Sequence, residues 1–300
     1  MPPFADILRR HACELAPQPT GMESQLRPLR GLGAVLFDLY GTLFISGIGE
    51  VGTVAEGASQ AAVEAALEAM GVAPAGSLEG VAEQMQGRVR AVHAEITRRH
   101  GIDHPEVQMP EIWSDVLAEL ARRGMLDSAD VGRIDCERFA VEYEARANPC
   151  WPMPGILRCL AALREQGLLL GIVSNAQFYT PLLFPALLGR SAEACGFEPH
   201  LQFYSYRHGQ AKPGPALFAL AARALAERGV GAAGTLYVGN DMLNDVGAAS
   251  RLGFRTALFA GDARSLRLRE DDPRVAGITP TLVITDLAQL AAVYYDFDIP

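Results

Sequence analysis

The chain has 300 residues, of which 49% are hydrophobic and 20% are charged, so it has the composition of a folded globular protein rather than of a disordered one. Its length fits one large domain or two modest ones. The formal net charge of -9, from 26 basic and 35 acidic residues, argues against nucleic acid or an anionic membrane as a partner.

Residues 1–32 carry several prolines and glycines, which predict an N-terminal extension with partial disorder. The apolar run 34–37 then predicts a short buried strand that ends at Asp38. Residues 49–148 are rich in Ala, Glu, Gln, Met and Arg at helical spacing, and no strand pattern interrupts them. The helices predicted in this region are 53–71, 78–100, 110–124 and about 130–147.

After residue 149 the pattern changes to alternating helices and strands. Strands are predicted at 168–173, 235–239, 254–259 and 282–285, and helices at 156–166, 215–228 and 286–294. The first strand therefore belongs to an α/β sheet whose other strands follow a long helical insertion. We expect a Rossmann-like, mostly parallel core from residues 33–48 and 149–300, an all-helical cap at 49–148, and the extension at 1–32.

In open α/β sheets, ligands bind at the carboxyl ends of the strands, so the polar residues that end the apolar runs indicate the site. The runs end in Asp38, in Ser174-Asn175, and in Gly239-Asn240-Asp241 with Asp245 close behind, while Lys212-Pro213 lies between the last two runs. Three carboxylates can share a small site only if a cation screens them, and Mg²⁺ prefers oxygen ligands.

This set of side chains has a chemical logic. Lys212 would pair with Asp38 or with a substrate anion, and Ser174 would donate a hydrogen bond to that anion. Asp38 would attack a phosphoryl group and form an aspartyl-phosphate that water hydrolyses. We therefore predict a small anionic substrate and Mg²⁺ as the cofactor.

The four segments, in this order, resemble the four motifs of the haloacid dehalogenase superfamily from about residue 33 to about residue 260. The resemblance implies a Rossmann-like core closed by a helical cap, with Asp38 as nucleophile and Lys212 as charge stabiliser. It also implies a phosphate contact from Ser174, and we expect Tyr40, Thr42 and Asn175 to line the substrate site as well. The metal ligands that it implies are Asp38, Asp241 and Asp245.

Two departures from the family pattern bear on the chemistry. Most family phosphatases have a second aspartate as acid and base where this chain has Tyr40, whose phenol is a poor general base at neutral pH. Asn240 occupies the position where many members place a metal-binding aspartate, so either Asp241 takes over or the metal site is altered. A tyrosine two residues after the nucleophile, as Tyr40 is here, is typical of the metal-free 2-haloacid dehalogenases. However, residues 44–50 lack the arginine that those enzymes use.

Three functions therefore stay open: Mg²⁺-dependent phosphate hydrolysis, which the sequence favours, 2-haloacid dehalogenation, and a weakly active or non-enzymatic binding scaffold. The run 264–269 carries three arginines and has the pattern of a solvated charged loop. The five cysteines are scattered without a C-x-x-C pair, which predicts reduced thiols. No run of 18 apolar residues occurs and residues 1–10 do not have the pattern of a signal peptide, so we expect a cytoplasmic protein.

Overall fold

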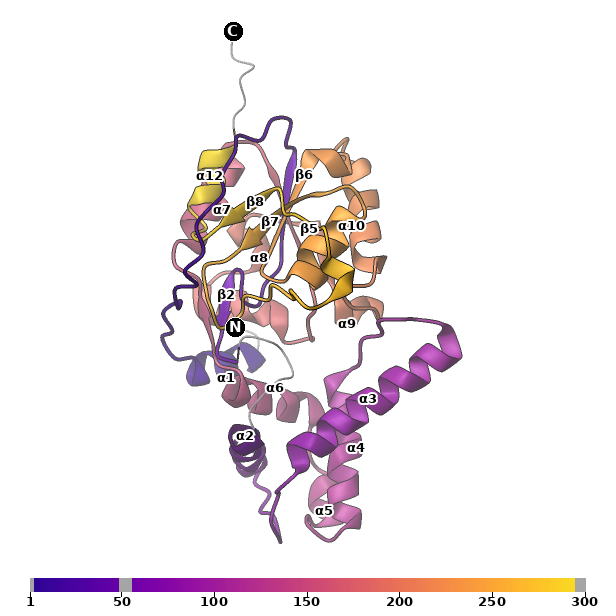
Figure 1. The fold of residues 1–300 in the computed structure, drawn as a ribbon. Coiled ribbons are helices and arrows are strands. Elements are labelled where there is room, and N and C mark those ends of the chain that lie inside the picture. Colours follow the sequence, from indigo (N-terminus) through magenta and orange to yellow (C-terminus); the bar gives the residue numbers. More distant parts are fainter. Residues whose placement is uncertain (1–2, 49–55, 295–300) are drawn as a thin grey trace.

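The structure is a computed structural model that describes residues 3–48 and 56–294 (Figure 1). Its core is a six-stranded, all-parallel sheet with the strand order β5-β4-β1-β6-β7-β8. The strands are β1 (Ala34–Phe37), β4 (Leu169–Ser174), β5 (Phe197–Tyr204), β6 (Thr235–Gly239), β7 (Arg255–Phe259) and β8 (Leu282–Ile284). Because β1 lies between β4 and β6 and all strands point the same way, the last residue of β4, Ser174, lies at the same edge of the sheet as Asp38 and Asn240, which follow β1 and β6.

Different helices cover the two faces of the sheet. On β1, Val35 and Phe37 belong to the hydrophobic cluster that includes α7 (Ile156–Glu165), whereas Ala34 and Leu36 belong to the cluster of α10 (Ala216–Ala226). Side chains alternate across a strand, so a strand that is buried on both faces needs an uninterrupted apolar run. Helix α12 (Gln289–Val293) packs beside α7, and α11 (Ala248–Ser250) joins the α10 cluster. The predicted α/β fold with a mostly parallel, Rossmann-like sheet is confirmed.

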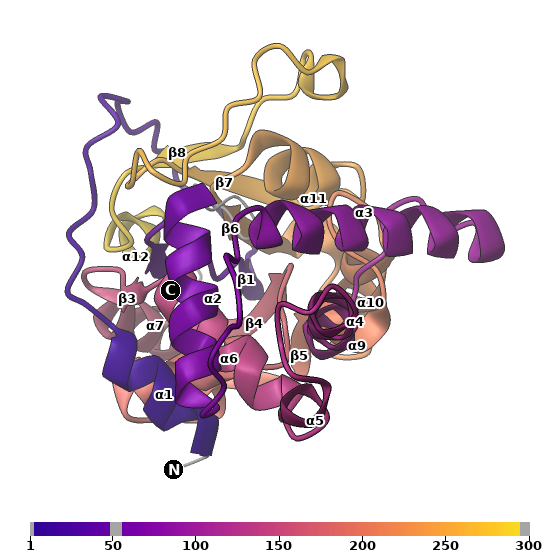
Figure 2. The same cartoon turned by 90° about the horizontal axis from the view of Figure 1, so that it is seen from below.

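The helical insertion leaves and rejoins the core through a two-stranded antiparallel ribbon, β2 (Phe44–Ser46) with β3 (Cys150–Pro152). Between these strands lie α2 (Glu56–Ala69), α3 (Val81–His100), α4 (Met109–Arg122), α5 (Ser128–Val131) and α6 (Cys136–Ala147). Figures 1 and 2 show these helices gathered on one side of the sheet-containing part. They share a core around Trp113, which is fully buried. The centroid of its ring lies 5.0 Å from that of Phe139 and 4.6 Å from that of Tyr143.

All five helices fall inside the predicted insertion at 49–148. Residues 49–55, which include the predicted start of the first helix, lie outside the described residues. The division of the chain into a cap and a core domain stays a prediction. None of the helices in the described ranges is both long and apolar enough to cross a bilayer.

The N-terminal segment differs from the predicted partial disorder. Residues Pro3–His11 form α1, which contacts α6 and buries Ala5, Ile7 and Leu8. Further along, Gln25 pairs with Val283 of β8, and Leu29 N donates to Val293 O over 2.7 Å. The proline and glycine residues thus belong to an extended segment that packs along the core.

Strand β5 and the short helices α8 (Ala192–Cys195) and α9 (Ser205–His208) were not predicted from the pattern. β5 is an edge strand with a register shift against β4, and its Pro199 and His200 are exposed. An edge strand pairs on one side only, so it tolerates proline and lacks a continuous apolar run. Short 3₁₀ or π turns occur at Thr180–Leu182, Phe184–Leu188, Ala232–Gly234, Met242–Gly247 and Pro273–Val275.

Candidate active site

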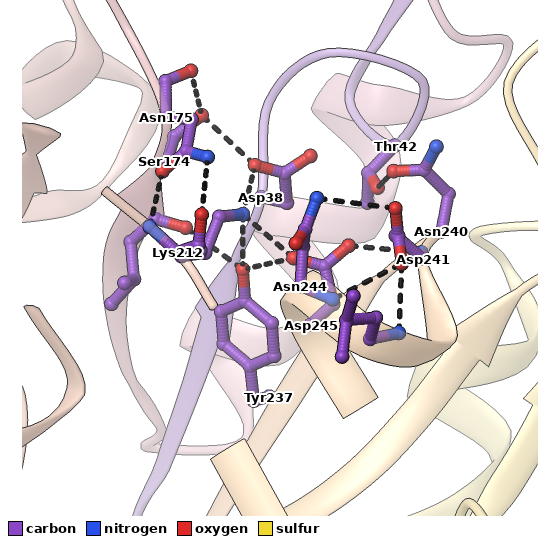
Figure 3. A network of polar contacts seen from close by, with 12 residues as sticks. Asp38, Thr42, Ser174, Asn175, Lys212, Tyr237, Asn240, Asp241, Asn244 and Asp245 are labelled. Atoms are coloured by element: carbon purple, nitrogen blue, oxygen red, sulfur yellow. Dashed lines mark hydrogen bonds and ion pairs between the residues drawn. The ribbon is translucent and has the colours of Figure 1, made fainter. Parts of the chain in front are cut away.

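Asp38 lies directly after β1, and one oxygen of its carboxylate is held by two donors (Figure 3). Ser174 Oγ donates to Asp38 Oδ1 over 2.9 Å, and Lys212 Nζ donates to the same atom over 2.7 Å. Asp38 is only 6% exposed, and among the residues that the structure describes its Oδ2 has no hydrogen-bond partner. A carboxylate with one oxygen fixed and the other free is suited to act as a nucleophile.

Lys212 is the only lysine in the sequence, and it connects two carboxylates. Its Nζ lies 2.7 Å from Asp38 Oδ1, 2.6 Å from Asp245 Oδ1 and 3.0 Å from the Tyr237 hydroxyl. Asn175 fixes the lysine backbone, because its Oδ1 accepts from Lys212 N at 2.7 Å and its Nδ2 donates to Lys212 O at 3.1 Å. Burial lowers the pKa of Lys212, but Asp245 and Asp38 outweigh burial and raise it, so the ammonium stays charged.

Asp245 is enclosed in the same cluster. Its Oδ1 accepts from Lys212 and lies 3.0 Å from the Tyr237 hydroxyl, while its Oδ2 accepts from Asp241 N at 3.0 Å. Burial raises the pKa of Asp245 to about 6 even though the neighbouring Lys212 opposes the shift. The Tyr237 hydroxyl also lies 2.8 Å from Val173 O, which ties the cluster to β4.

Asp241 points to a different set of partners. Its Oδ1 accepts from the backbone N–H groups of Leu243 and Asn244, at 2.7 and 3.0 Å, as the cap of the turn Met242–Gly247. Its Oδ2 accepts from Arg269 Nη2 at 2.7 Å and from Arg269 Nε at 3.1 Å. The structure therefore brings Asp38, Lys212 and Asp245 together and pairs Asp241 with an arginine.

Thr42 and Asn240 hold the loop after β1 against the rest of the site. Thr42 Oγ1 donates to Asn240 Oδ1 over 3.3 Å, and Asn240 Nδ2 donates to Ser265 O. Gly41 has a φ of +78°, and a Cβ there would lie 2.4 Å from Ser265 Cβ, so only glycine fits this turn.

Tyr40 does not offer an acid to the site through its phenol. Its ring is part of the main hydrophobic cluster, and its hydroxyl lies 3.0 Å from Thr180 Oγ1. Burial holds the pKa of Tyr40 well above its usual value, with further contributions from Cys150 and Glu144. A phenol in this environment is a weak acid at neutral pH.

Backbone donors beside the nucleophile are left without acceptors. Within residues 3–48 and 56–294, the backbone N–H groups of Leu39, Tyr40 and Asn175 make no hydrogen bond. Leu39 is fully buried and Tyr40 is 8% exposed, and buried N–H groups in native proteins are almost always paired. Successive free N–H groups form a binding site for an anion.

A cavity of about 580 Å³ lies between α3, the segment that follows it, and the edge of the sheet that carries Asn175 and Lys212. Its polar lining residues include Arg90, His93, Asp103, His104, Glu106, Glu144, Gln177, Asn175 and Lys212. Burial raises the pKa of both Glu106 and Glu144. This volume suits a small molecule, and its charged lining combines carboxylates with the cations Arg90 and Lys212.

The three predicted metal ligands, Asp38, Asp241 and Asp245, already have partners in the structure. Asp38 and Asp245 are both paired with Lys212, and Asp241 is paired with Arg269, so all three expected ligands already have a cationic partner. The described part of the chain holds no cluster of three or more His, Cys, Asp or Glu side chains that could bind a metal ion. The arrangement does not fit one ion held jointly by Asp38, Asp241 and Asp245, and their metal role stays a prediction.

Two residues of the site were not predicted from the sequence. Tyr237 lies inside a mostly apolar strand, and the only signal in the sequence was the phenol hydroxyl that this residue places within the strand. Arg269 lies in a charged loop far from the motifs in sequence, and the repeated arginines of 264–269 were a weak signal for it.

Comparisons with known proteins agree with this fold. A family model described as haloacid dehalogenase-like hydrolase matches residues 32–253. Among solved structures, a 2-haloacid dehalogenase from Pseudomonas syringae pv. Tomato DC3000 is 20% identical with a TM-score of 0.58, over 87% of this chain and 97% of that chain. The defluorinating L-2-haloacid dehalogenase Rha0230 is 17% identical with a TM-score of 0.51, over 93% of this chain and 98% of that chain.

YfnB from Bacillus subtilis, solved bound to magnesium, is 17% identical with a TM-score of 0.50, over 88% of this chain and 99% of that chain. At these identities the likenesses show a shared fold. A comparison with curated proteins gave no significant match.

Proposed function

Because the chain belongs to the haloacid dehalogenase-like hydrolases, we propose that its Asp38 displaces a halide from a 2-haloacid without a metal ion. The observation that supports this proposal most is the identity and burial of the side chain at position 40. Tyr40 stands where a phosphatase of this family needs its acid, and its hydroxyl is buried against Thr180. A halide is a stable anion that leaves without a proton, whereas an alkoxide needs one.

In the first step Asp38 Oδ2 attacks the carbon that bears the halogen. The oxygen–carbon bond forms as the carbon–halogen bond breaks, and the electron pair of that bond leaves with the halide. Ser174 and Lys212 hold Oδ1, so the free oxygen is the one that faces the substrate. Displacement from the rear inverts the carbon and leaves an alkyl ester of Asp38.

The substrate carboxylate needs donors, and the site provides them without an arginine in 44–50. The unpaired backbone N–H groups belong to Leu39 and Tyr40, which follow Asp38, and to Asn175, which follows Ser174. Asp38 and Ser174 are joined by a hydrogen bond. These N–H groups are suited to bind one carboxylate, with Lys212 as the nearby positive charge.

In the second step water attacks the carbonyl carbon of the Asp38 ester. The acyl–oxygen bond breaks, Asp38 is regenerated as a carboxylate, and the 2-hydroxy acid and one proton are released. Lys212 neutralises the regenerated carboxylate, because its ammonium group donates a hydrogen bond to Asp38 Oδ1. The cycle consumes one water and releases one halide.

Mg²⁺-dependent phosphate hydrolysis is the second candidate, and one observation favours it. Asp38, Asp241 and Asp245 lie at the same edge of the sheet, as a metal-dependent phosphatase of this family requires. For this function Asp241 would have to exchange Arg269 for the ion. A magnesium ion bound by these residues would neutralise the phosphate charge.

Release of halide and of phosphate, measured on the same protein, separates the two candidates. Halide is measured with 2-chloropropionate and phosphate with p-nitrophenyl phosphate, each with EDTA and with added Mg²⁺. We expect halide release that EDTA does not change, and a loss of at least about 10³-fold in Asp38→Asn. Phosphate release that requires Mg²⁺, without halide release, would support the second candidate. Turnover of neither substrate class would favour the binding scaffold.

A further inference from the structure

The arginine-rich loop at 264–269 is anchored along the residues that follow β6. Met242 N donates to Arg267 O over 2.9 Å, and Arg267 N donates to Asn240 O over 3.0 Å. These bonds form a short parallel bridge between Asp241 and Arg267. The loop is therefore fixed to the edge of the candidate site.

This anchoring places the Arg269 guanidinium on Asp241. Nη2 and Nε of Arg269 both donate to Asp241 Oδ2, at 2.7 and 3.1 Å. The Asp241 side chain is 8% exposed and that of Arg269 is 30% exposed, so the pair is largely shielded from water. The backbone of Arg269 has a φ of +56°, in the left-handed region that side chains other than glycine seldom adopt. Such conformations persist where the surrounding structure holds them.

The carboxylates of the site are thus all paired with cationic side chains of the chain itself. Three carboxylates, Asp38, Asp241 and Asp245, are matched by two cations, Lys212 and Arg269. A divalent ion added to this arrangement would have to displace a guanidinium from a shielded carboxylate. An arginine stays charged at any pH at which the protein is folded, so it is a permanent substitute for such an ion.

We propose that Arg269 takes the place of the divalent ion at Asp241, as a resident cation that makes the site independent of metal. This inference rests on the metal-free function proposed above, and it adds a residue outside the four motifs. Arg269 acts through Asp241 and is a positioning residue. Its removal should expose an oxygen site that a metal ion can occupy.

Metal binding by the full-length protein tests this directly, independently of any substrate. The probes are Mg²⁺ and Mn²⁺ alone, measured by calorimetry, by thermal unfolding and by the Mn²⁺ electron paramagnetic resonance signal. The variants are Arg269→Met, which keeps a side chain of similar length without charge, and Arg269→Met combined with Asp241→Asn. Arg274→Met is the matched control, because Arg274 lies just beyond this loop, in the turn Pro273–Val275, and pairs with Asp272 instead of Asp241.

We expect wild type and Arg274→Met to bind neither ion in the millimolar range. Arg269→Met should bind Mn²⁺ at least about tenfold more tightly than wild type, and its midpoint of thermal unfolding should rise with the metal concentration. Adding Asp241→Asn should remove that gain.

Two results would overturn the proposal: wild type that binds Mg²⁺ as tightly as Arg269→Met, or a folded Arg269→Met that gains no metal affinity. If Arg269→Met does not fold, the Mn²⁺ affinity of Arg269→Gln is compared with that of wild type, and the same two results would overturn the proposal. Failure of the halide assay with success here would reject the proposed substrate and leave Arg269 as the resident cation.

Discussion

The Tyr40 hydroxyl and Thr180 Oγ1 lie 3.0 Å apart in the buried seam next to the nucleophile loop. Thr180 Oγ1 also accepts from Gln177 N at 3.0 Å, so the phenol belongs to a structural network. This pairing separates the side chain at position 40 from the acid and base chemistry that the family places there.

Replacing Tyr40 with phenylalanine should therefore affect stability more than catalysis. The variant loses one buried hydrogen bond, which costs about 1 kcal/mol in the free energy of unfolding. The kcat should change far less than the about 10²- to 10⁴-fold that removal of a general acid causes. Denaturant unfolding and steady-state kinetics with 2-chloropropionate measure the two effects. A loss of kcat above about 10²-fold in a folded variant would show that the phenol transfers a proton.

Replacing Lys212 with methionine should destabilise the protein strongly at alkaline pH. Asp38 and Asp245 would remain buried without a counter-charge, and breaking a buried pair costs about 3–5 kcal/mol. The loss should be smaller near pH 5, because Asp245 can then take up a proton. Lys212→Arg, which keeps the charge, is the matched control for urea unfolding at pH 5 and pH 8. Equal stability of Lys212→Met and wild type at pH 8 would contradict this.

The single lysine allows the titration of Asp245 to be followed in isolation. In protein labelled with ¹⁵N-lysine, only Lys212 Nζ gives a side-chain signal. Its chemical shift should show a step near pH 6, where Asp245 takes up a proton, and no loss of its own proton at pH 9 because its pKa is raised. Asp245→Asn should remove the step near pH 6. A step that persists unchanged in that variant would assign it to another group.

Glu106 connects the segment between α3 and α4 to the core, since Ser205 Oγ donates to it at 2.6 Å and Gln177 Nε2 at 3.2 Å. Burial raises its pKa above the value of 4.5 in the unfolded chain, so the folded state binds the proton more tightly. The contribution of this group to stability is thus present at low pH and is lost as the pH rises through the folded value.

Glu106→Gln should keep the hydrogen-bond acceptor without the charge. We expect its midpoint of thermal unfolding to match wild type within error at pH 5 and to exceed it by a few degrees at pH 8. Glu111→Gln, a change on the exposed face of α4, is the control. A variant that is less stable than wild type at pH 8 would show that the charged form is preferred in the folded state.

The sheet and the motif residues could be predicted because they depend on local patterns. The run 34–37 is continuously apolar and is followed by Asp38, and mostly apolar strands end at Ser174 and Gly239. Once the strands are parallel, the topology alone brings these ends to one edge.

The partners of the motif residues could not be predicted in this way. The contacts of Tyr40 with Thr180 and of Asp241 with Arg269 join positions 140 and 28 residues apart, and no local pattern encodes them. The N-terminal helix was missed for a related reason: its buried face is covered by α6, from a distant part of the sequence.

The fate of the oxygen from water in a single turnover tests the central claim most directly. Excess enzyme is mixed with 2-chloropropionate in H₂¹⁸O, and the peptide that contains Asp38 is analysed by mass spectrometry, with Asp38→Asn as the control. Attack on the ester carbonyl should place one ¹⁸O atom in the Asp38 carboxylate and none in the first product formed. An unlabelled Asp38 peptide after complete turnover, with ¹⁸O in the released product instead, would contradict a carbon ester of Asp38 and with it the proposed function.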